Sequence, residues 1–445
     1  MGIDVFAPGS DGYEANRGAF NVLLSQEPAA IVTPAGAADV VDAVEHAKTA
    51  GLRIGAQRTG HSAEPLGDLA GTLLVRTAAI DTVSIDAERR VARVGAGALW
   101  GDLVPQASEI GLVACHGSSP TVGIVGYSLG GGVGWYGRKH GLQCNLVTAI
   151  ELVDASATER RIDAETDPEL FWALRGGGGD FGIVTALEFE LLATPEVFAG
   201  ALFFPVERAS EVLHAWHEWT ASVPEEVTSV GRLMSFPPLP EMPDALRGKD
   251  FVIVEAVALL PEAEAAEVLA PLRGLGPAMD SFATQPPAGV SGLHMDPPAP
   301  APYASAGMLL GDLPGEAIDQ LLAAVGPDSP SKLLSVEIRH DGGAMARTDP
   351  AHGAMDTLPG SYLMFGVGIV PEPAAMAPTK EWLAAMSGAM EPWDAGRYLN
   401  FSDEVENIAV AFPPETVERL RAAKAKYDPE SLFHSNHPVV SRTGE

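Results

Sequence analysis

The 445 residues of this chain exceed what one typical hydrophobic core accommodates, so we expect two domains. Apolar residues make up 46% and charged residues 20%, which is the composition of a globular protein rather than of a disordered one. With 59 acidic against 28 basic residues the formal net charge is -31, which opposes binding to nucleic acid or to an anionic membrane.

Two further features indicate a cytoplasmic protein. The first twenty residues mix acidic, basic and glycine residues without the apolar core of a signal peptide, and no apolar stretch reaches the length of a membrane span. Cys115 and Cys144 provide neither a disulfide framework nor metal-ligand spacing, which agrees with a reducing compartment. We therefore expect a soluble protein with no membrane partner and no nucleic-acid partner.

The first part of the chain alternates short strands with an amphipathic helix. Residues 38–50 place apolar side chains on one helical face and end at Gly51, a residue that commonly terminates helices. Strands are expected, in chain order, at 53–56, 72–75, 82–85, 90–94, 147–153 and 183–191. This pattern ends near residue 195, so the first domain is predicted to span residues 1–195.

Longer strands and helices with proline-rich connections follow, which predicts a second domain over residues 196–395. Its strands are expected at 200–205, 229–235, 250–258, 306–310, 333–340 and 361–369. Its helices are expected at 210–222, 263–270, 315–325 and 374–390. Such a pattern favours an antiparallel sheet with helices on one face. A helix at 414–424 lies in a C-terminal segment, 396–445, that we expect to return to the first domain.

Glycine is unusually dense between Gly117 and Gly137, where eight of 21 residues are glycine. The backbone there must turn tightly or lie close to a flat or anionic ligand. The run Gly132-Val133-Gly134-Trp135-Tyr136-Gly137 fits the spacing G-x-G-x-x-G, but no strand is expected to lead into it, so a Rossmann unit is rejected. About sixty residues upstream lies Arg58-Thr59-Gly60-His61-Ser62.

These two segments resemble the FAD-linked oxidases of the berberine bridge enzyme-like group, which share the vanillyl-alcohol oxidase or PCMH type of FAD-binding domain. The resemblance continues through Asp167 to Thr185 and through Lys426 to Pro438. It implies an α+β fold, in which a PCMH-type FAD-binding domain of two subdomains is joined to an α/β substrate domain with an antiparallel sheet covered by helices.

The resemblance also implies which residues bind FAD. They are Arg58, Thr59, Gly60, His61, Ser62, Ser119, Pro120, Thr121, Val122, Gly123, Gly126, Tyr127, Gly130, Gly131, Gly132, Gly134, Gly182, Ile183, Val184, Asn400, Asn436 and His437. Glycine-rich backbone supplies N–H groups to anionic cofactors in other folds as well. No metal is expected, because His214 and His217 on one helix lack a third ligand.

The family bonds a histidine at the place of His61 to the flavin 8-methyl carbon, and an alkylated imidazole should raise the flavin potential. Bicovalent relatives make a second bond through a cysteine directly before Pro-Thr-Val-Gly, where this chain has Ser119. The resemblance thus implies FAD held through His61 only. The spacing alone favours a hydrogen-bonded turn histidine, and the covalent bond is implied by the resemblance.

Substrate oxidation needs a base near the flavin ring. The family's Tyr-x-Asn-Tyr appears here as Tyr398-Leu399-Asn400-Phe401, so the second phenol is missing. Tyr398, Glu337 and His340 are the candidate catalytic residues. Strand alternation puts Glu337 and Arg339 on one face and His340 on the other, so only one set reaches the substrate. Packing for the tyrosine and an ion pair for Glu337 with Arg339 remain open alternatives.

The expected activity is that of an FAD-dependent oxidase, which takes hydride from a small alcohol, sugar or natural-product intermediate and reduces O2 to H2O2. Val122 stands where family members that react readily with oxygen carry valine. Two alternatives remain: an oxidative cyclase or dehydrogenase that uses another acceptor, and a redox-inactive flavin-binding protein.

Overall fold

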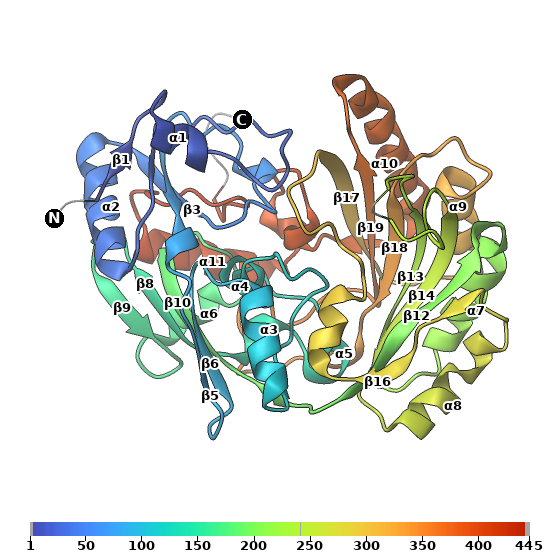
Figure 1. The fold of residues 1–445 in the computed structure, drawn as a ribbon. Helices are drawn as coiled ribbons and strands as arrows, with labels where there is room; N and C mark the ends of the chain where they lie inside the picture. Colours follow the sequence, from blue (N-terminus) through green and yellow to red (C-terminus); the bar gives the residue numbers. More distant parts are fainter. Residues whose placement is uncertain (1–2, 241, 441–445) are drawn as a thin grey trace.

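Two layered units stand side by side in the computed structural model, which describes residues 3–240 and 242–440 (Figure 1). The N-terminal unit consists of two small sheets with short helices, and the other unit is one broad sheet with helices on its outer side. This arrangement confirms the expected α+β fold. Within the described residues, no helix combines the length and apolar character needed to cross a bilayer.

The first small sheet has the order β1-β2-β4-β3 and contains β1 (Val5–Phe6), β2 (Ala30–Val32), β3 (Arg53–Gln57) and β4 (Thr72–Arg76). Helix α2 (Ala37–Ala50) connects β2 to β3, and both strands run parallel to β4. The helix ends at Gly51, whose φ of 68° is the left-handed conformation that glycine adopts at little cost. Helix α1 (Asp11–Asn16) precedes this unit.

The second small sheet is antiparallel, in the order β5-β6-β10-β8-β9. Its strands are β5 (Val83–Asp86), β6 (Val91–Gly95), β8 (Val147–Val153), β9 (Glu159–Ile162) and β10 (Ile183–Glu190). The helices of this region are α3 (Trp100–Glu109), α4 (Ile124–Leu129), α5 (Gly137–His140) and α6 (Pro168–Leu174). A two-stranded pair, β7 (Leu112–Val113) with β11 (Leu192–Ala193), lies where the chain leaves for the second unit.

The broad sheet has nine strands in the order β15-β12-β14-β13-β18-β19-β17-β20, with β16 paired to β12. These are β12 (Val197–Pro205), β13 (Val227–Ser235), β14 (Asp250–Ala258), β15 (Met279–Asp280), β16 (Ala283–Gln285), β17 (Tyr303–Leu310), β18 (Ser335–His340), β19 (Tyr362–Ile369) and β20 (Asp394–Gly396). Its helices are α7 (Ala209–Thr220), α8 (Glu262–Arg273), α9 (Gly315–Val325) and α10 (Met376–Met390). Every named pairing is antiparallel.

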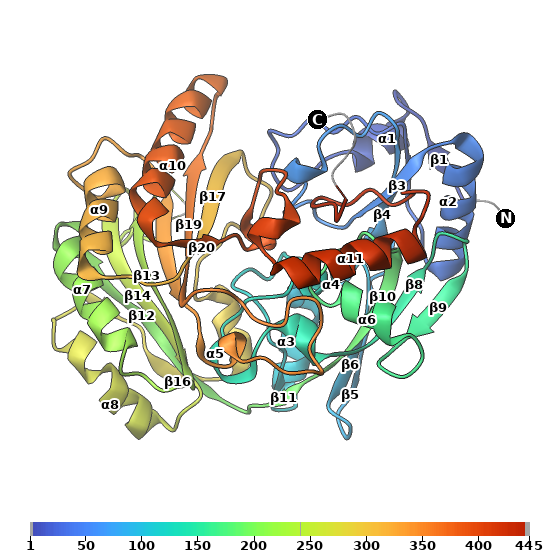
Figure 2. The ribbon, with the colours of Figure 1, turned by 180° about the vertical axis from the view of Figure 1, so that it is seen from behind.

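The two faces of this sheet have different neighbours, and Figure 2 shows helices α7 to α10 on the side away from the N-terminal unit. A side chain at Gly231 would meet the Trp216 ring of α7 at 2.9 Å, so odd positions of β13 face the helices. Its neighbour Val230 packs instead with Trp135 and Tyr136 of the N-terminal unit. We call the face that carries Val230 the inner face, because it looks toward the glycine-dense residues 117–137, here called the glycine segment.

The C-terminal segment contacts the N-terminal unit. Helix α11 (Pro414–Tyr427) lies beside α6, and Phe433 forms an isolated bridge with Ile54 at the edge of the first sheet (Figure 2). The buried Lys424 ammonium donates to Asp428 at 2.7 Å and to the carbonyl oxygen of Asp180, also at 2.7 Å. Contacts from α11 and from residues 428–434 therefore complete the N-terminal unit.

Candidate active site

The loop after β3 places His61 in a half-buried position beside the glycine segment. Its ring stacks on Phe20 with centroids 3.7 Å apart, and Nδ1 lies 2.8 Å from the Thr59 hydroxyl. Gly60 has φ of 77°, and a Cβ there would meet Ala19 at 2.8 Å, so the turn requires glycine. Burial lowers the pKa of His61 to about 4, so the imidazole is neutral near pH 7 and retains a nucleophilic lone pair.

Two arginines hold the His61 loop to its surroundings. Arg58 donates from Nε to the carbonyl oxygen of Gly97 at 2.5 Å, in the turn between β6 and α3. Arg76 donates to the carbonyl oxygens of Arg58 and Gly18 at 3.1 and 3.2 Å. Since both guanidinium groups are engaged with main-chain acceptors, they fix the loop backbone, which presents His61 in one orientation.

The glycine segment touches the His61 loop through a short chain of hydroxyl groups. Ser119 Oγ lies 2.9 Å from Thr121 Oγ1, which in turn lies 3.4 Å from His61 Nε2. Pro120 lies between them, and its carbonyl oxygen accepts from Gly101 at 2.8 Å. The half-buried Val122 follows, and its carbonyl oxygen accepts from Trp100 at 3.1 Å. The loops that sequence analysis paired are thus adjacent in space.

Several glycines of the segment lie where no side chain fits. An added Cβ would meet Asn400 at 2.0 Å from Gly130, Met355 at 2.4 Å from Gly131, and the Tyr127 ring at 2.7 Å from Gly132. Gly131 and Gly132 also have φ of 109° and 88°, a region that disfavours other residues. An added Cβ at Gly134 would lie 2.1 Å from the carbonyl oxygen of His116, so this position also excludes a side chain. At Gly126, by contrast, an added Cβ would have no atom within 4 Å.

The last part of the chain contacts both loops. Asn400 donates to the carbonyl oxygen of Tyr127 at 3.1 Å, and Asn436 donates to Ser62 Oγ at 2.9 Å. His437 Nε2 lies 3.0 Å from the carbonyl oxygen of Leu399. These contacts place three more of the predicted cofactor residues around the two loops.

The other predicted cofactor residues lie in less accessible places. Gly123 precedes helix α4, and Gly182 precedes β10, where an added Cβ would meet Leu152 at 2.5 Å. Ile183 and Val184 pair with β8 and are buried in two different apolar clusters. Their predicted contact with FAD remains a prediction.

The residues of the two loops fit a flavin nucleotide. The backbone amides of Thr59, Gly60 and Ser62 donate to no acceptor within the described part of the chain, so they are available to a phosphate. The His61 imidazole is neutral, and a neutral ring nitrogen is needed to form a bond to the flavin 8-methyl carbon. The open space beside Gly126 leaves room for part of a flat ring, whereas the Cβ positions of Gly130 to Gly132 are already filled by the protein's own side chains.

Across from the glycine segment, the inner face of the sheet carries a cluster of five ionisable side chains, four of them buried and Arg339 partly buried. It comprises Arg232 on β13, Glu255 on β14, Glu337 and Arg339 on β18, and His294 from the loop after β16. His294 bridges the two carboxylates, with Nδ1 2.5 Å from Glu255 and Nε2 2.6 Å from Glu337. Arg339 Nε donates to the other oxygen of Glu337 at 2.7 Å, and Arg232 lies 2.6 Å from Glu255.

The electrostatics of this cluster are those of a closed ion-pair network. Burial and Arg232 lower the pKa of His294, but Glu255 and Glu337 outweigh them and raise it to about 9, so the imidazole is protonated near pH 7. Burial raises the pKa of Glu337, but Arg339 and His294 hold it well below its usual range. Three cations therefore surround two carboxylates. Sequence reasoning found Glu337 and Arg339 but missed His294, which comes from a proline-rich connection.

The two other candidate bases have different positions. His340 faces the helices, where it stacks on Tyr362 at 5.5 Å and lies 2.9 Å from Arg138 Nη1. Burial lowers its pKa to about 3. The Tyr398 hydroxyl oxygen accepts from Asn400 at 2.9 Å and from the amides of Gly132 and Val133 at 2.9 and 3.1 Å. Tyr398 thus braces the glycine segment, and burial raises its pKa to about 12.

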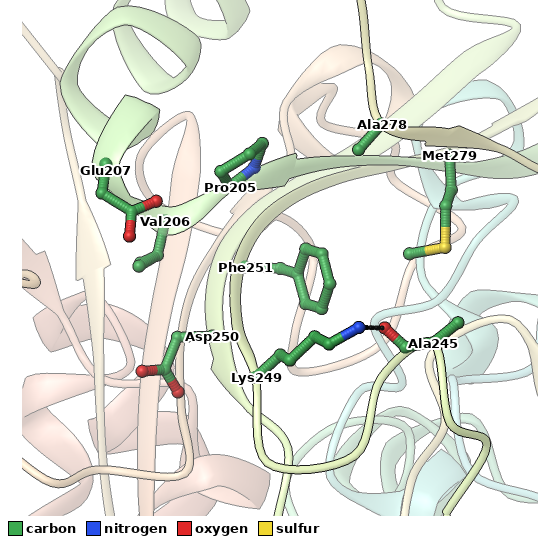
Figure 3. Close-up of a pocket in the computed structure, with 9 residues that line it drawn as sticks. All are labelled: Pro205, Val206, Glu207, Ala245, Lys249, Asp250, Phe251, Ala278 and Met279. Carbon is green, nitrogen blue, oxygen red and sulfur yellow. Dashed lines mark hydrogen bonds between the residues drawn. The ribbon is translucent and has the colours of Figure 1, made fainter.

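Two cavities bear on the choice of site. A cavity of about 10 Å³ lies between the glycine segment and the inner face, lined by Ser118, Val133, Gly134, Trp135, Thr228, Val230, Arg339 and Asp341. A cleft of about 540 Å³ opens elsewhere, where β12 and β14 meet the loop before β14 (Figure 3). Apart from the buried Phe251, its lining is exposed or half-buried, and Lys249 donates there to Ala245 at 3.0 Å. The cleft of about 540 Å³ contains none of the predicted site residues.

No cluster of three or more metal-ligating side chains occurs among the described residues. His214 Nδ1 lies 2.8 Å from the carbonyl oxygen of Ser210, and His217 lies 6.2 Å from the Tyr362 ring. Their contacts are those of a half-buried helix face.

Comparison with known proteins points to one group. Residues 28–163 match the family model described as an FAD binding domain, and residues 397–440 match the model described as berberine and berberine like. (R)-6-hydroxynicotine oxidase of Paenarthrobacter nicotinovorans is 29% identical over 98% of this chain and 96% of its own. A xylooligosaccharide oxidase of Thermothelomyces thermophilus is 33% identical over 51% of this chain and 47% of its own. The solved structure of Physcomitrella patens BBE-like 1 superimposes with a TM-score of 0.85 at 22% identity, covering 99% and 98% of the two chains.

Proposed function

We propose that this chain is an FAD-linked oxidase of the berberine bridge enzyme-like group, and that it oxidises a small organic molecule with a hydroxyl or amine beside an oxidisable C–H bond. The observation that carries the proposal is a juxtaposition: two loops that fit FAD lie opposite a buried, charged sheet face, with a small cavity between them. When bound, FAD supplies a two-electron acceptor that takes hydride from carbon.

The attachment of FAD is proposed to be a single bond through His61. Its imidazole is neutral, stacked and held by Thr59, which preorganises one ring orientation. Ser119 stands where a second, cysteine-derived bond would require sulfur, and Cys115 and Cys144 are fully buried with their pKa values raised by burial to about 12. Neither cysteine offers a thiolate near neutral pH.

The substrate is proposed to approach from the inner face of the sheet. The relatives named above act on a hydroxylated nicotine and on xylooligosaccharides, according to their names, so amines and sugars both belong in a first screen. Apolar lining from Val133, Trp135 and Val230 would pack against the substrate, while Arg339 and Asp341 supply polar contacts. Electrons are proposed to pass to O2, giving H2O2, which the small side chain of Val122 favours.

The test begins with the visible spectrum of the purified protein and acid precipitation. A yellow pellet from the wild type and from His46→Ala, with a colourless pellet from His61→Ala, is the expected result. His46 lies on α2 away from both loops and controls for the loss of a histidine. A yellow supernatant from the wild type would contradict the covalent bond, and a protein that never binds flavin would contradict the cofactor assignment.

The second stage is an anaerobic screen for flavin bleaching with (R)-6-hydroxynicotine, xylobiose and simple aromatic alcohols. A compound that bleaches the flavin and then yields one H2O2 per turnover in air supports an oxidase. Bleaching without peroxide would instead indicate a dehydrogenase or cyclase that needs another acceptor. A protein that dithionite bleaches but none of the compounds does would contradict the proposed substrate class.

A further inference from the structure

Each catalytic base suggested by the sequence lacks a free acceptor on the inner face. Both oxygens of Glu337 are engaged, one by His294 at 2.6 Å and the other by Arg339 at 2.7 Å. The Tyr398 oxygen already accepts three hydrogen bonds, and His340 lies on the helix side of the sheet. A base must lie within hydrogen-bond reach of the proton it removes, so another group is needed.

Asp341 is the carboxyl group that meets this need. It follows β18 directly and continues the alternation of Glu337 and Arg339, which brings it to the inner face. Asp341 is only 2% exposed, yet its Oδ2 atom has no hydrogen-bond partner among the described residues. An unpaired buried polar atom is costly, which indicates that it is kept for a ligand.

The backbone around Asp341 is held firmly, so its side chain has a defined direction. The Asp341 amide donates to the carbonyl oxygen of Ser361 at 2.9 Å, and Arg138 donates to the Asp341 carbonyl oxygen at 2.5 Å. Gly342 and Gly343 follow with φ of 79° and 58°, which turns the chain sharply away from the sheet. The strand end therefore fixes the carboxyl group at the cavity between the sheet and the glycine segment.

The size of that cavity sets what can enter. About 10 Å³ is close to the minimum that holds one water, so it accommodates a single hydroxyl or amine group rather than a whole substrate. Gly134 and Ser118 form the opposite wall, on the segment that fits FAD. A group placed there lies between the proposed cofactor site and the Asp341 carboxyl group.

We propose that Asp341 is the catalytic base of the proposed oxidation, which rests on the function proposed above. The carboxylate Oδ2 accepts the proton from the substrate hydroxyl or amine, and the electrons of that O–H or N–H bond form the second bond of a carbonyl or imine. The substrate C–H bond breaks at the same time and its electron pair leaves as hydride to FAD. The proton rests on Asp341 and the two electrons on the cofactor, so the step is balanced.

The charges around Asp341 suit this role. Burial raises its pKa to about 7 although Arg339 on its own strand and Arg138 on α5 both lower it. The other cavity walls, Ser118, Val133, Gly134, Trp135, Thr228 and Val230, carry no group that titrates near neutral pH. A base works best when its pKa lies near the working pH, so a carboxyl group with a pKa raised toward neutrality suits this role.

The first test follows the carboxyl group itself in the flavin-loaded protein by infrared spectroscopy between pH 5 and 9. The C=O band of a protonated carboxyl should disappear with a midpoint near pH 7 in the wild type and be missing in Asp341→Asn. Asp403→Asn serves as the control. Burial also raises the pKa of Asp403, but this carboxylate accepts a hydrogen bond from Ser305 and lies outside the cavity. A band that persists unchanged in Asp341→Asn would overturn the inference, whatever the substrate is.

The second test uses the compound that bleaches the flavin in the anaerobic screen. Loss of a general base typically costs 10²- to 10⁴-fold, so Asp341→Asn should slow bleaching by roughly that factor and abolish its dependence on pH near 7. Asp341→Glu should recover part of the rate, and dithionite should still bleach every variant. An Asp341→Asn protein that melts like the wild type and is bleached at the wild-type rate would refute the assignment of Asp341, while leaving the proposed oxidase function intact.

Discussion

Replacing His294 by glutamine should destabilise the protein strongly and in a pH-dependent manner. The imidazolium joins two carboxylates that are 0% and 2% exposed, at 2.5 and 2.6 Å. Its pKa rises from an ordinary 6.5 to about 9 on folding. At 1.36 kcal/mol per pKa unit, that shift corresponds to about 3 kcal/mol of stability. Removing one partner of a buried ion pair typically costs 3–5 kcal/mol, which agrees in size.

The direction with pH follows from the raised pKa. A group that binds its proton more tightly when folded contributes its full stability below pH 6.5 and loses that contribution as the pH rises through 9. Urea unfolding at pH 6, 8 and 10 should therefore show a gap of about 3 kcal/mol between wild type and His294→Gln at pH 6 that narrows toward pH 10.

His214→Gln provides the matched control, because this histidine of α7 is only half-buried, with a side chain 34% exposed. Its unfolding free energy should stay near that of the wild type. If His294→Gln lost less than about 1 kcal/mol at pH 6, or if the gap did not change with pH, His294 would not be the protonated bridge described here.

Three further substitutions probe the cofactor side. Tyr398→Phe removes the acceptor of the Gly132 and Val133 amides, and each buried donor left without a partner costs about 1–3 kcal/mol. The variant should therefore have a lower melting temperature and bind flavin more weakly. Unchanged flavin content would contradict the role of Tyr398 in supporting the glycine segment. Ser119→Cys should give a second covalent bond, visible as flavin that stays with the peptide of residue 119 after digestion; its absence would mean that this loop lies too far from the ring. Val122→Leu places a bulkier side chain on the path of oxygen, so it should slow reoxidation of reduced flavin in air without changing anaerobic reduction. An equal loss in both steps would argue for a packing defect instead.

Local patterns were sufficient to predict most of the fold. The strand expected at 250–258 and the helix expected at 315–325 coincide with β14 and α9, because alternation and helical periodicity are properties of neighbouring residues. Strand β12 begins at Val197 rather than at residue 200, since its first residues pair with β16, a partner more than eighty residues away. That extension depends on tertiary contact, which the local pattern does not contain.

The same distinction between local pattern and tertiary contact applies to the residues of the candidate site. His61 and the glycine segment were predictable because consecutive residues carry the signal, and the structure brings them within 3.4 Å of each other through Thr121. His294 was missed because its partners, Glu255 and Glu337, are 39 and 43 residues away along the chain and nothing periodic surrounds it. Tyr398 was proposed as a base from its motif, yet its hydroxyl supports the glycine segment, a role visible only once residues 132 and 398 are seen together.

The return of the C-terminal segment has a consequence for how the protein is made. Strand β3 exchanges backbone hydrogen bonds with residues 432 to 434, and Lys424 anchors the end of α11 to Asp180. On the ribosome these partners emerge several hundred residues after β3, so the N-terminal unit cannot reach its final form during most of synthesis. The broad sheet, whose strands all lie between residues 197 and 396, is finished earlier. The half of the molecule that is translated first is therefore the half that is assembled last. Early termination near residue 400 would leave the His61 loop and the glycine segment without their C-terminal contacts.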